Sequence, residues 1–192
     1  MSVLRAEGVG VRHHRQWIVR GLDAVVEPGD LVALTGPPGS GRTTALLALA
    51  GRFKLTEGKI KNAMGTPLGY VAGVTDPEPT ATVAEHVRER LALLGRRRRE
   101  LDTVPLLGLD PTLRGYLLSP YQRHLLGLVL ARMEHPAAIA LDDADTGLDD
   151  AEREHLHQAL TDLTSEGLAV LFTARSVPTG SVTQEISLGV AA

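Results

Sequence analysis

Residues 36–44 read Gly36-Pro37-Pro38-Gly39-Ser40-Gly41-Arg42-Thr43-Thr44. The pattern G-x-x-x-x-G-K-[ST] is typical of loops that surround nucleotide phosphates with backbone N–H groups, while its lysine reaches the β- and γ-phosphates. This stretch has the glycines and the hydroxyl residues of the pattern, but Arg42 takes the place of the lysine. The loop therefore predicts a nucleotide phosphate site, and the arginine raises the question of whether the nucleotide is hydrolysed.

The residues on either side of this loop predict the structure that such a loop requires. Residues 30–35 form a short apolar run suited to a buried strand. Residues 43–50 are rich in alanine and leucine, which predicts a helix, and Gly51 can end it. The loop thus lies between a strand and a helix, where the N-terminal end of the helix adds to the attraction for phosphate.

Strands and helices alternate along the rest of the chain, as in an α/β protein. Alternating or β-branched residues predict strands at 3–12, 17–27, 68–72, 137–141, 168–173 and 183–188. Apolar spacing predicts helices at 82–94, 121–134 and 149–165, with a further helical stretch up to residue 107. Thr82 and Glu85 have the spacing of a capping box, and Ser119 can cap the helix that follows it.

The composition is that of a soluble globular protein, with 43% hydrophobic and 22% charged residues in a chain of 192. One domain of this length can bury a substantial core. The net charge of −3 gives no general attraction to nucleic acid or anionic membrane, and the absence of cysteine excludes disulfides and thiolate catalysis. No apolar run approaches a membrane span, and the start does not resemble a signal peptide. This composition is compatible with a reducing compartment, and we expect any membrane role to come through a partner.

An acidic pair follows the apolar run 137–141, and further motifs stand at fixed distances from it. The phosphate loop 36–44 corresponds to the motif called Walker A. Asp142 fits the acid of the second motif, Walker B, which is held near the Mg²⁺ ion beside such a loop. Three further segments resemble motifs of ATP-binding-cassette (ABC) proteins. Thr146-Gly147-Leu148-Asp149 stands at the position of the D-loop, and Leu118-Ser119-Pro120-Tyr121-Gln122-Arg123 at that of the LSGGQ signature. Glu27-Pro28-Gly29-Asp30 resembles the turn that precedes Walker A in this family. With five motifs in register, residues 3–176 resemble an ABC transporter nucleotide-binding domain.

The resemblance implies an α/β P-loop NTPase of ABC type, with a mixed central sheet flanked by helices, an antiparallel β part and a short helical subdomain. Residues 1–192 would form a single ABC-type ATP-binding domain, with the nucleotide-binding core at 1–75 and 119–192 and the helical subdomain at 76–118. Two cassettes would pack head to tail as a homo- or heterodimer, with each ATP between the phosphate loop of one and the signature of the other. A transmembrane permease subunit would be a further partner. Nucleic acid binding and direct membrane insertion are not expected, so the chain would be cytoplasmic or peripheral on the inner face of the cell membrane.

The same resemblance implies roles for individual residues. ATP would be bound by Gly36, Gly39, Ser40, Gly41, Arg42, Thr43 and Thr44, with the ring of His13 stacking on adenine. Mg²⁺ would be held by Thr43 and, through water, by Asp142. Asp143 would be a weak general base, and Ser119, Gln122 and Asp149 would face the second cassette. Two alternatives stay open: Arg42 swings out into an ion pair and the loop binds nothing tightly, and His13 is an ordinary surface histidine.

Several positions depart from the family pattern. Asp143 stands where the family has the glutamate that serves as general base. Gly73 replaces the glutamine of the Q-loop, and Ala174 replaces the switch histidine. In the signature, Pro120 lacks an N–H and Tyr121 adds bulk. An aspartate carboxylate lies about 1.5 Å further back than that of glutamate, and a misplacement of about 1 Å can lower a rate about a hundredfold. Together with Arg42, these changes predict slow or impaired hydrolysis.

Three functional hypotheses follow. The first is an ABC-transporter-like ATP-binding protein that binds Mg·ATP and hydrolyses it slowly. The second is a non-hydrolysing regulatory or scaffold cassette that keeps the fold for dimerisation. The third is the degenerate half of a heterodimeric ABC ATPase. A phosphoryl-transferring kinase fits least, because nothing in the sequence supplies a lid for an acceptor substrate.

Overall fold

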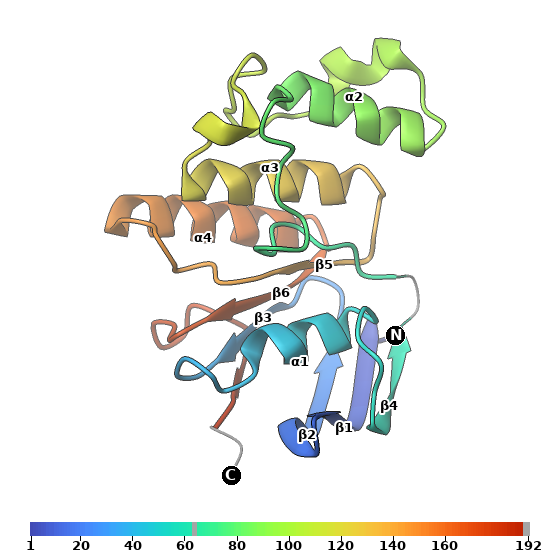
Figure 1. Ribbon diagram of the computed structural model, residues 1–192, viewed down its shortest axis with the longest axis vertical. Helices are drawn as coiled ribbons and strands as arrows, with labels where there is room; N and C mark the ends of the chain where they lie inside the picture. The colour runs from blue at the N-terminus through green and yellow to red at the C-terminus, as the bar shows by residue number, and fades with distance from the viewer. Residues whose placement is uncertain (63–64, 190–192) are drawn as a thin grey trace.

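The computed structural model describes residues 1–62 and 65–189 and has an α/β architecture (Figure 1). Its strands are β1 Leu4–His13, β2 Gln16–Val26, β3 Leu31–Thr35, β4 Glu57–Asn62, β5 Ala138–Leu141, β6 Ala169–Ala174 and β7 Gln184–Ser187. Its helices are α1 Arg42–Leu49, α2 Val83–Leu93, α3 Pro120–Arg132 and α4 Asp150–Ser165, with the 3₁₀ helices η1 Arg98–Thr103 and η2 Gly115–Leu117. The predicted fold class is confirmed. The predicted domain ranges also include 63–64 and 190–192, which lie outside the described residues.

A parallel sheet with the strand order β5-β6-β3-β7 forms the centre of the molecule. Strands β3, β5 and β6 are buried at every position, which explains why their sequences are almost continuously apolar. Helix α1 covers one face of this sheet, and α3 and α4 cover the other (Figure 1). Because parallel strands end at the same edge, the loops that follow β3, β5 and β6 gather there.

The antiparallel part is a separate sheet with the order β2-β1-β4. Its apolar side packs with α1 and one face of the parallel sheet in a single hydrophobic core. Strand β4 was not predicted from the sequence, because Ile60 is the only large apolar residue in Glu57–Asn62. As an edge strand it carries charged side chains, which weakens the alternation on which a strand prediction depends.

Helices α2, α3 and α4 each begin with a capping box. In α2, the Thr82 hydroxyl accepts a hydrogen bond from the Glu85 N–H, and the Glu85 carboxylate accepts one from the Thr82 N–H. Ser119 and Gln122 form the same reciprocal pair at α3, where Pro120 occupies the first helical position. Both predicted caps are confirmed.

Two predicted elements differ in the structure. The segment 68–72 pairs with β5 over part of its length, since the Gly69 N–H donates to the Ala140 carbonyl and the Asp142 N–H donates to the Tyr70 carbonyl. It is described as a β-bridge between Leu68 and Ala140 rather than as a full strand. Helix α3 packs directly on this segment, since a Cβ at Gly127 would lie 2.4 Å from the backbone nitrogen of Tyr70. The helix predicted at 82–94 ends where expected, but the further helical stretch predicted up to residue 107 is only the 3₁₀ helix η1 in the described structure. Gly95, with a φ of 67°, ends α2 in the left-handed conformation, and only the short η1 follows.

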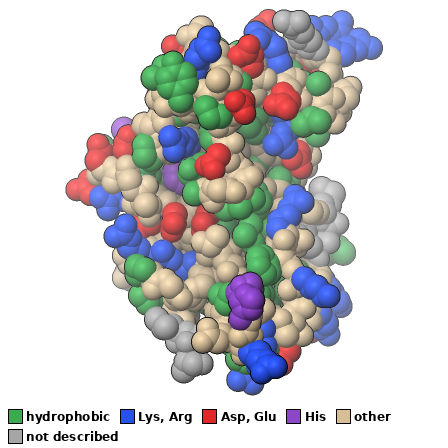
Figure 2. Space-filling view, in the orientation of Figure 1, with side chains coloured by type: hydrophobic (Ala, Val, Ile, Leu, Met, Phe, Trp, Pro, Cys, Tyr) green, Lys and Arg blue, Asp and Glu red, His purple; other side chains and the backbone are tan. Residues whose placement is uncertain are grey.

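Charged side chains of both signs are dispersed over the face shown in Figure 2, with small hydrophobic patches between them. This mixture agrees with the small net charge of −3. Within residues 1–62 and 65–189, none of the helices has the length and apolar character that crossing a bilayer requires.

Candidate nucleotide-binding site

The loop 36–41 connects β3 to α1 and has a backbone that only glycine suits at several positions. Gly39 and Gly41 have φ values of 83° and 84°, in the region that side chains disfavour. A Cβ at Gly36 would lie 2.4 Å from the Leu188 carbonyl oxygen, and one at Gly41 would lie 2.5 Å from that of Ile18. The loop is therefore held closely between the ends of β2 and β7, and it leads directly into the N-terminus of α1.

Two polar groups of this loop region are buried without a partner. Ser40 is 2% exposed, and its Oγ makes no hydrogen bond. The Nη1 atom of Arg42 is also buried and unpaired. Because buried donors without partners cost free energy, such groups call for an explanation. An anion in the loop would provide acceptors for both, so the residues present fit a nucleotide phosphate.

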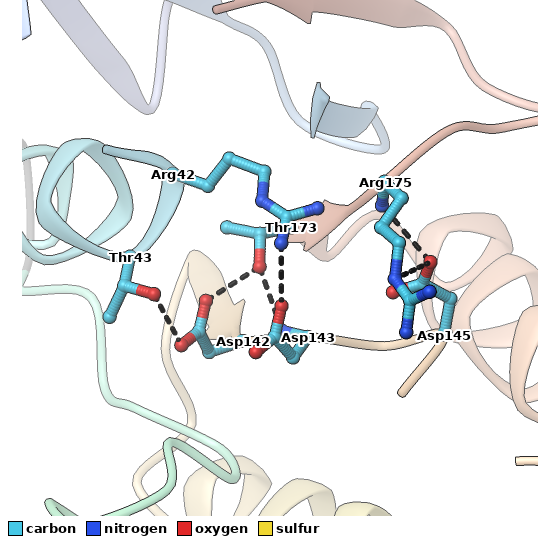
Figure 3. Close-up of polar contacts among 7 residues, drawn as sticks. All are labelled: Arg42, Thr43, Asp142, Asp143, Asp145, Thr173 and Arg175. Atoms are coloured by element: carbon cyan, nitrogen blue, oxygen red, sulfur yellow. Dashed lines mark hydrogen bonds and ion pairs between the residues drawn. The ribbon is translucent and has the colours of Figure 1, made fainter. Parts of the chain in front are cut away.

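Thr43, Asp142 and Thr173 form a chain of hydrogen bonds at the carboxyl edge of the sheet (Figure 3). The Thr43 hydroxyl donates to Asp142 Oδ2 over 2.8 Å, and the Thr173 hydroxyl donates to Asp142 Oδ1 over 2.5 Å. Asp142 is 6% exposed, so its carboxylate is fixed in place. The structure thus brings together Thr43 and Asp142, the two residues predicted to hold Mg²⁺.

A hydroxyl and one carboxylate suit Mg²⁺ only in combination with other oxygen ligands. In the described part of the chain, no group of three or more His, Cys, Asp or Glu side chains could hold a metal ion alone. Mg²⁺ is commonly bound by one or two carboxylates together with water and substrate phosphates. Thr43 and Asp142, next to the phosphate loop, therefore fit a magnesium ion that arrives with a nucleotide.

Arg42 turns toward the second acid of the pair (Figure 3). Its Nη2 atom lies 3.2 Å from Asp143 Oδ1, and its side chain is only 11% exposed. Burial raises the pKa of Asp143, the neighbouring Asp142 raises it further, and Arg42 acts in the opposite direction. The ion pair expected as an alternative for Arg42 is present, but it points into the site rather than away from it.

The end of β6 supplies no imidazole to this edge. Ala174, at the position of the switch histidine, is 2% exposed. The following residue, Arg175, donates its N–H to Asp145 Oδ2 over 3.0 Å, and its Nε lies 3.8 Å from the same atom. Sequence reasoning missed Asp145, although a third acid in the run 142–145 was a visible signal.

His124 of α3 lies behind the acidic pair and was also missed. It is 2% exposed, and its ring meets that of Tyr70 edge to face with centroids 5.2 Å apart. Burial lowers the pKa of His124 to about 4, and a hydrogen bond to the backbone of Asp143 acts in the opposite direction. A histidine inside a leucine-rich helix was the signal that could have found it.

The residues predicted to face a second cassette serve as helix caps within this chain. Ser119 and Gln122 close the first turn of α3, and Asp149 accepts a hydrogen bond from the Glu152 N–H at the start of α4. None of the hydrogen bonds described for these three side chains reaches the phosphate loop. A Cβ at Gly147 would lie 3.2 Å from the ring of Pro120, so the predicted D-loop packs against the predicted signature.

His13 lies at the end of β1 and is exposed. Its ring meets that of His14 edge to face, with centroids 4.0 Å apart. The guanidinium groups of Arg12 and Arg20 lie 4.9 and 5.0 Å from the ring centroid of the nearby Trp17, which is half-buried. His13 and His14 are thus more exposed than Trp17 at this tip.

A sequence model described as ABC transporter matches residues 19–146, a range that holds the phosphate loop, Asp142 and Asp143. The chain belongs to the ABC transporter family. The resemblance to a nucleotide-binding domain of this family is confirmed.

Two relatives show how far the likeness extends. The zinc import ATP-binding protein ZnuC of Rhizobium johnstonii is 32% identical over 149 residues, which are 74% of this chain and 48% of that protein. The aliphatic sulfonates import ATP-binding protein SsuB 1 of Rhodococcus jostii is 28% identical over 163 residues, which are 83% of this chain and 66% of that protein. The chain therefore spans about half to two thirds of these relatives.

The fold of the family is also found among solved structures. A dimeric ATP-binding cassette in a post-hydrolysis state, bound to ADP and Pi, matches 97% of this chain and 94% of its own with a TM-score of 0.77. At 20% sequence identity this likeness shows the fold alone.

Proposed function

We propose that this chain is an ABC-transporter-like ATP-binding protein that binds Mg·ATP through the loop 36–44. The observation that carries the proposal is the pair of buried, unpartnered groups, Ser40 Oγ and Arg42 Nη1, in a glycine loop at the start of α1. Oriented backbone N–H groups and a helix N-terminus form a ready site for phosphate. Gly36, Gly39, Gly41 and Thr44 complete the loop, and His13 is the candidate for the adenine contact.

Mg²⁺ would be held by Thr43 and, through water, by Asp142, where it would neutralise charge on the phosphates. The bond from Thr43 to Asp142 keeps the hydroxyl oxygen of Thr43 free to act as a ligand, because its proton points to the carboxylate. Asp143 would orient a water molecule. The roles proposed for Thr43, Asp142 and Asp143 rest on the positions of these residues around the phosphate loop.

Hydrolysis is proposed to be slow. Arg42 holds the carboxylate that would act as base, and this carboxylate belongs to an aspartate rather than a glutamate. Ala174 offers no imidazole to a γ-phosphate, and Pro120 removes an N–H from the signature. The same observations favour the second candidate, a non-hydrolysing regulatory or scaffold cassette, and they suit the degenerate half of a heterodimer.

A second cassette and a transmembrane permease subunit are the proposed partners. Ser119, Gln122 and Asp149 would face the second cassette, and the chain would lie in the cytoplasm or against the inner face of the membrane. The division into a core at 1–75 and 119–192 and a helical subdomain at 76–118 belongs to the same proposal. The cargo stays unassigned, since the names of the two relatives refer to zinc and to aliphatic sulfonates.

Two glycine variants test the phosphate site. Gly39 and Gly51 have φ values of 83° and 70°, and a Cβ at either would meet nothing within 4 Å. Gly39→Ala and Gly51→Ala should therefore each lose about 1 kcal/mol of stability. Only Gly39→Ala should weaken binding of ATP, measured with a fluorescent ATP analogue and displacement by ATP. Equal ATP affinity in the two variants would contradict binding at this loop.

A phosphate-release assay separates slow hydrolysis from none. Enzymes commonly turn over at about 1–10³ s⁻¹, and we expect a rate at least about a hundredfold lower here. Activity that disappears in both Asp142→Asn and Asp143→Asn would rule out the non-hydrolysing cassette. An ordinary turnover rate in the wild type would refute the proposal of slow hydrolysis.

A further inference from the structure

Thr173 is a fully buried polar residue inside an apolar strand. It is 0% exposed and precedes the last residue of β6, where it pairs in register with Leu34 of β3. Its neighbours along β6, Phe172 and Ala174, belong to the hydrophobic core. A hydroxyl in such a place needs partners, because burying it without hydrogen bonds is unfavourable.

The partners of this hydroxyl are the two acids at the end of β5 (Figure 3). Thr173 Oγ1 donates to Asp142 Oδ1 over 2.5 Å and accepts a hydrogen bond from the Asp143 N–H over 2.7 Å. The backbone carbonyl of Thr173 accepts a third bond, from the Ala144 N–H over 2.9 Å. One residue of β6 thus holds three consecutive residues that follow β5.

The direction of these bonds is fixed by their chemistry. A hydroxyl has one proton, and an ionised carboxylate can only accept, so the proton of Thr173 points to Asp142 and its lone pair to the Asp143 N–H. Asp143 has a φ of 45°, a conformation that non-glycine residues rarely adopt. The bond from its N–H to Thr173 compensates for this backbone, which turns the Asp143 side chain toward Arg42.

Asp142 is consequently held from two sides. Thr173 binds Oδ1, while Thr43, the proposed ligand of Mg²⁺, binds Oδ2. If the bond from Thr173 is lost, the carboxylate can rotate away from Thr43. Residues that orient metal ligands in this way commonly change metal affinity about 10–100-fold when they are replaced.

We propose that Thr173 is a positioning residue that fixes Asp142 for Mg²⁺ and, through the same hydroxyl, fixes the backbone of Asp143. The inference rests on the proposed binding of Mg·ATP. It concerns the hydroxyl group, because the methyl group and the volume of this side chain are preserved in valine.

Thr173→Val and Thr173→Ser test this role. The ATP affinity of each variant is measured with Mg²⁺ and with EDTA, and the ratio of the two affinities reports the contribution of the metal. Thr173→Val should reduce this ratio about tenfold or more and leave the affinity in EDTA nearly unchanged. Thr173→Ser, which keeps the hydroxyl, should retain most of the ratio. An unchanged ratio in Thr173→Val, or an equal loss in both variants, would overturn the proposal.

Thr183 offers a matched control at the opposite end of the sheet. Its hydroxyl also joins one backbone N–H and one oxygen, accepting from the Leu31 N–H and donating to the Leu31 carbonyl, each over 2.8 Å. Thr183→Val should therefore lose a similar pair of hydrogen bonds and keep the wild-type Mg²⁺ ratio. If Thr183→Val also lowered the ratio of ATP affinity with Mg²⁺ to ATP affinity with EDTA, any weakening of the sheet would reduce the contribution of the metal, which would contradict a specific role of Thr173.

Amide hydrogen exchange in the nucleotide-free protein gives a second readout. Residues 142–146 should exchange faster in Thr173→Val than in Thr183→Val or the wild type, because the Asp143 N–H loses its acceptor. If Thr173→Val does not fold, Thr173→Ala is used for both measurements. If the wild type binds no ATP, the proposed function fails, and amide exchange alone then tests the positioning role of Thr173. Unchanged exchange of residues 142–146 in Thr173→Val would overturn that role.

Discussion

Arg42 and Asp143 lie 101 positions apart in the sequence and meet in the site. A guanidinium presents several N–H donors in a planar fork, whereas an ammonium is a compact point charge. In Arg42, Nη2 is bound to Asp143, while Nη1 is buried without a partner. One side chain can therefore hold Asp143 and still offer a donor to a phosphate. We infer that the ion pair and phosphate binding do not exclude one another.

Replacing Arg42 tests its contact with phosphate. Arg42→Met keeps much of the length but removes the charge, and hydrogen bonds to charged groups contribute about 1.5–3 kcal/mol. We expect Arg42→Met to weaken ATP binding by about 2 kcal/mol, measured by fluorescence titration. Arg42→Lys, the matched control that keeps a cation, should retain most of the affinity. Wild-type affinity in Arg42→Met would show that the guanidinium does not contact the nucleotide.

His124 predicts a specific dependence of stability on pH. The pKa of this buried histidine is lowered from 6.5 to about 4. Between these values the unfolded chain binds a proton that the folded chain does not, so the free energy of unfolding falls as the pH falls. The contribution amounts to about 3 kcal/mol over this range.

Urea unfolding at several pH values measures this contribution. His124→Phe keeps a ring beside Tyr70 but cannot be protonated, so its stability should fall less than that of the wild type between pH 6.5 and 4. Parallel stability curves for the two proteins would contradict a neutral, buried His124.

At the scale of elements, the capping boxes explain why the helices begin where they do. Thr82 and Ser119 each precede an apolar-periodic segment by one residue and are followed three positions later by Glu85 or Gln122. This pattern is local, so the sequence predicts it well. In α3 the same serine and glutamine also occupy signature positions, and in this chain their side chains are occupied with capping.

The α3 cap gives a prediction about stability. Ser119→Ala should lower the free energy of unfolding by about 1 kcal/mol, because the Gln122 N–H loses its acceptor. Ser119→Asp should restore most of this loss, since aspartate is an equally good cap. Urea unfolding provides the measurement. Equal stability of Ser119→Ala and the wild type would show that the hydroxyl is not needed as a cap.

Elements that depend on their neighbours were harder to predict. Strand β4 exists because β1 offers it an edge to pair with, and its own residues show little apolar pattern. The segment 68–72 has strand-like residues, and its pairing depends on β5, with which its backbone forms hydrogen bonds and one β-bridge. In both cases tertiary contacts decide the structure, and a single sequence does not contain them.

At the scale of the whole molecule, the parallel sheet separates two hydrophobic cores and gathers the site at its carboxyl edge. Helix α1 and the antiparallel sheet share the core on one side, and α3 and α4 share the core on the other. The sequence predicts that the site lies at this edge, because the motif 36–44 and Asp142 each follow a buried strand. The pairing of Arg42 with Asp143 and the role of Thr173 depend on rotamers and on strand register, which motifs do not specify.

The central claim is that this loop binds a nucleotide although its cation is an arginine. Calorimetric titration of the wild-type protein with ATP in excess Mg²⁺ tests it most directly. We predict saturable binding with a dissociation constant below about 1 mM, equivalent to a binding free energy of about −4 kcal/mol or better. The absence of any binding heat at millimolar ATP with Mg²⁺ would contradict the account.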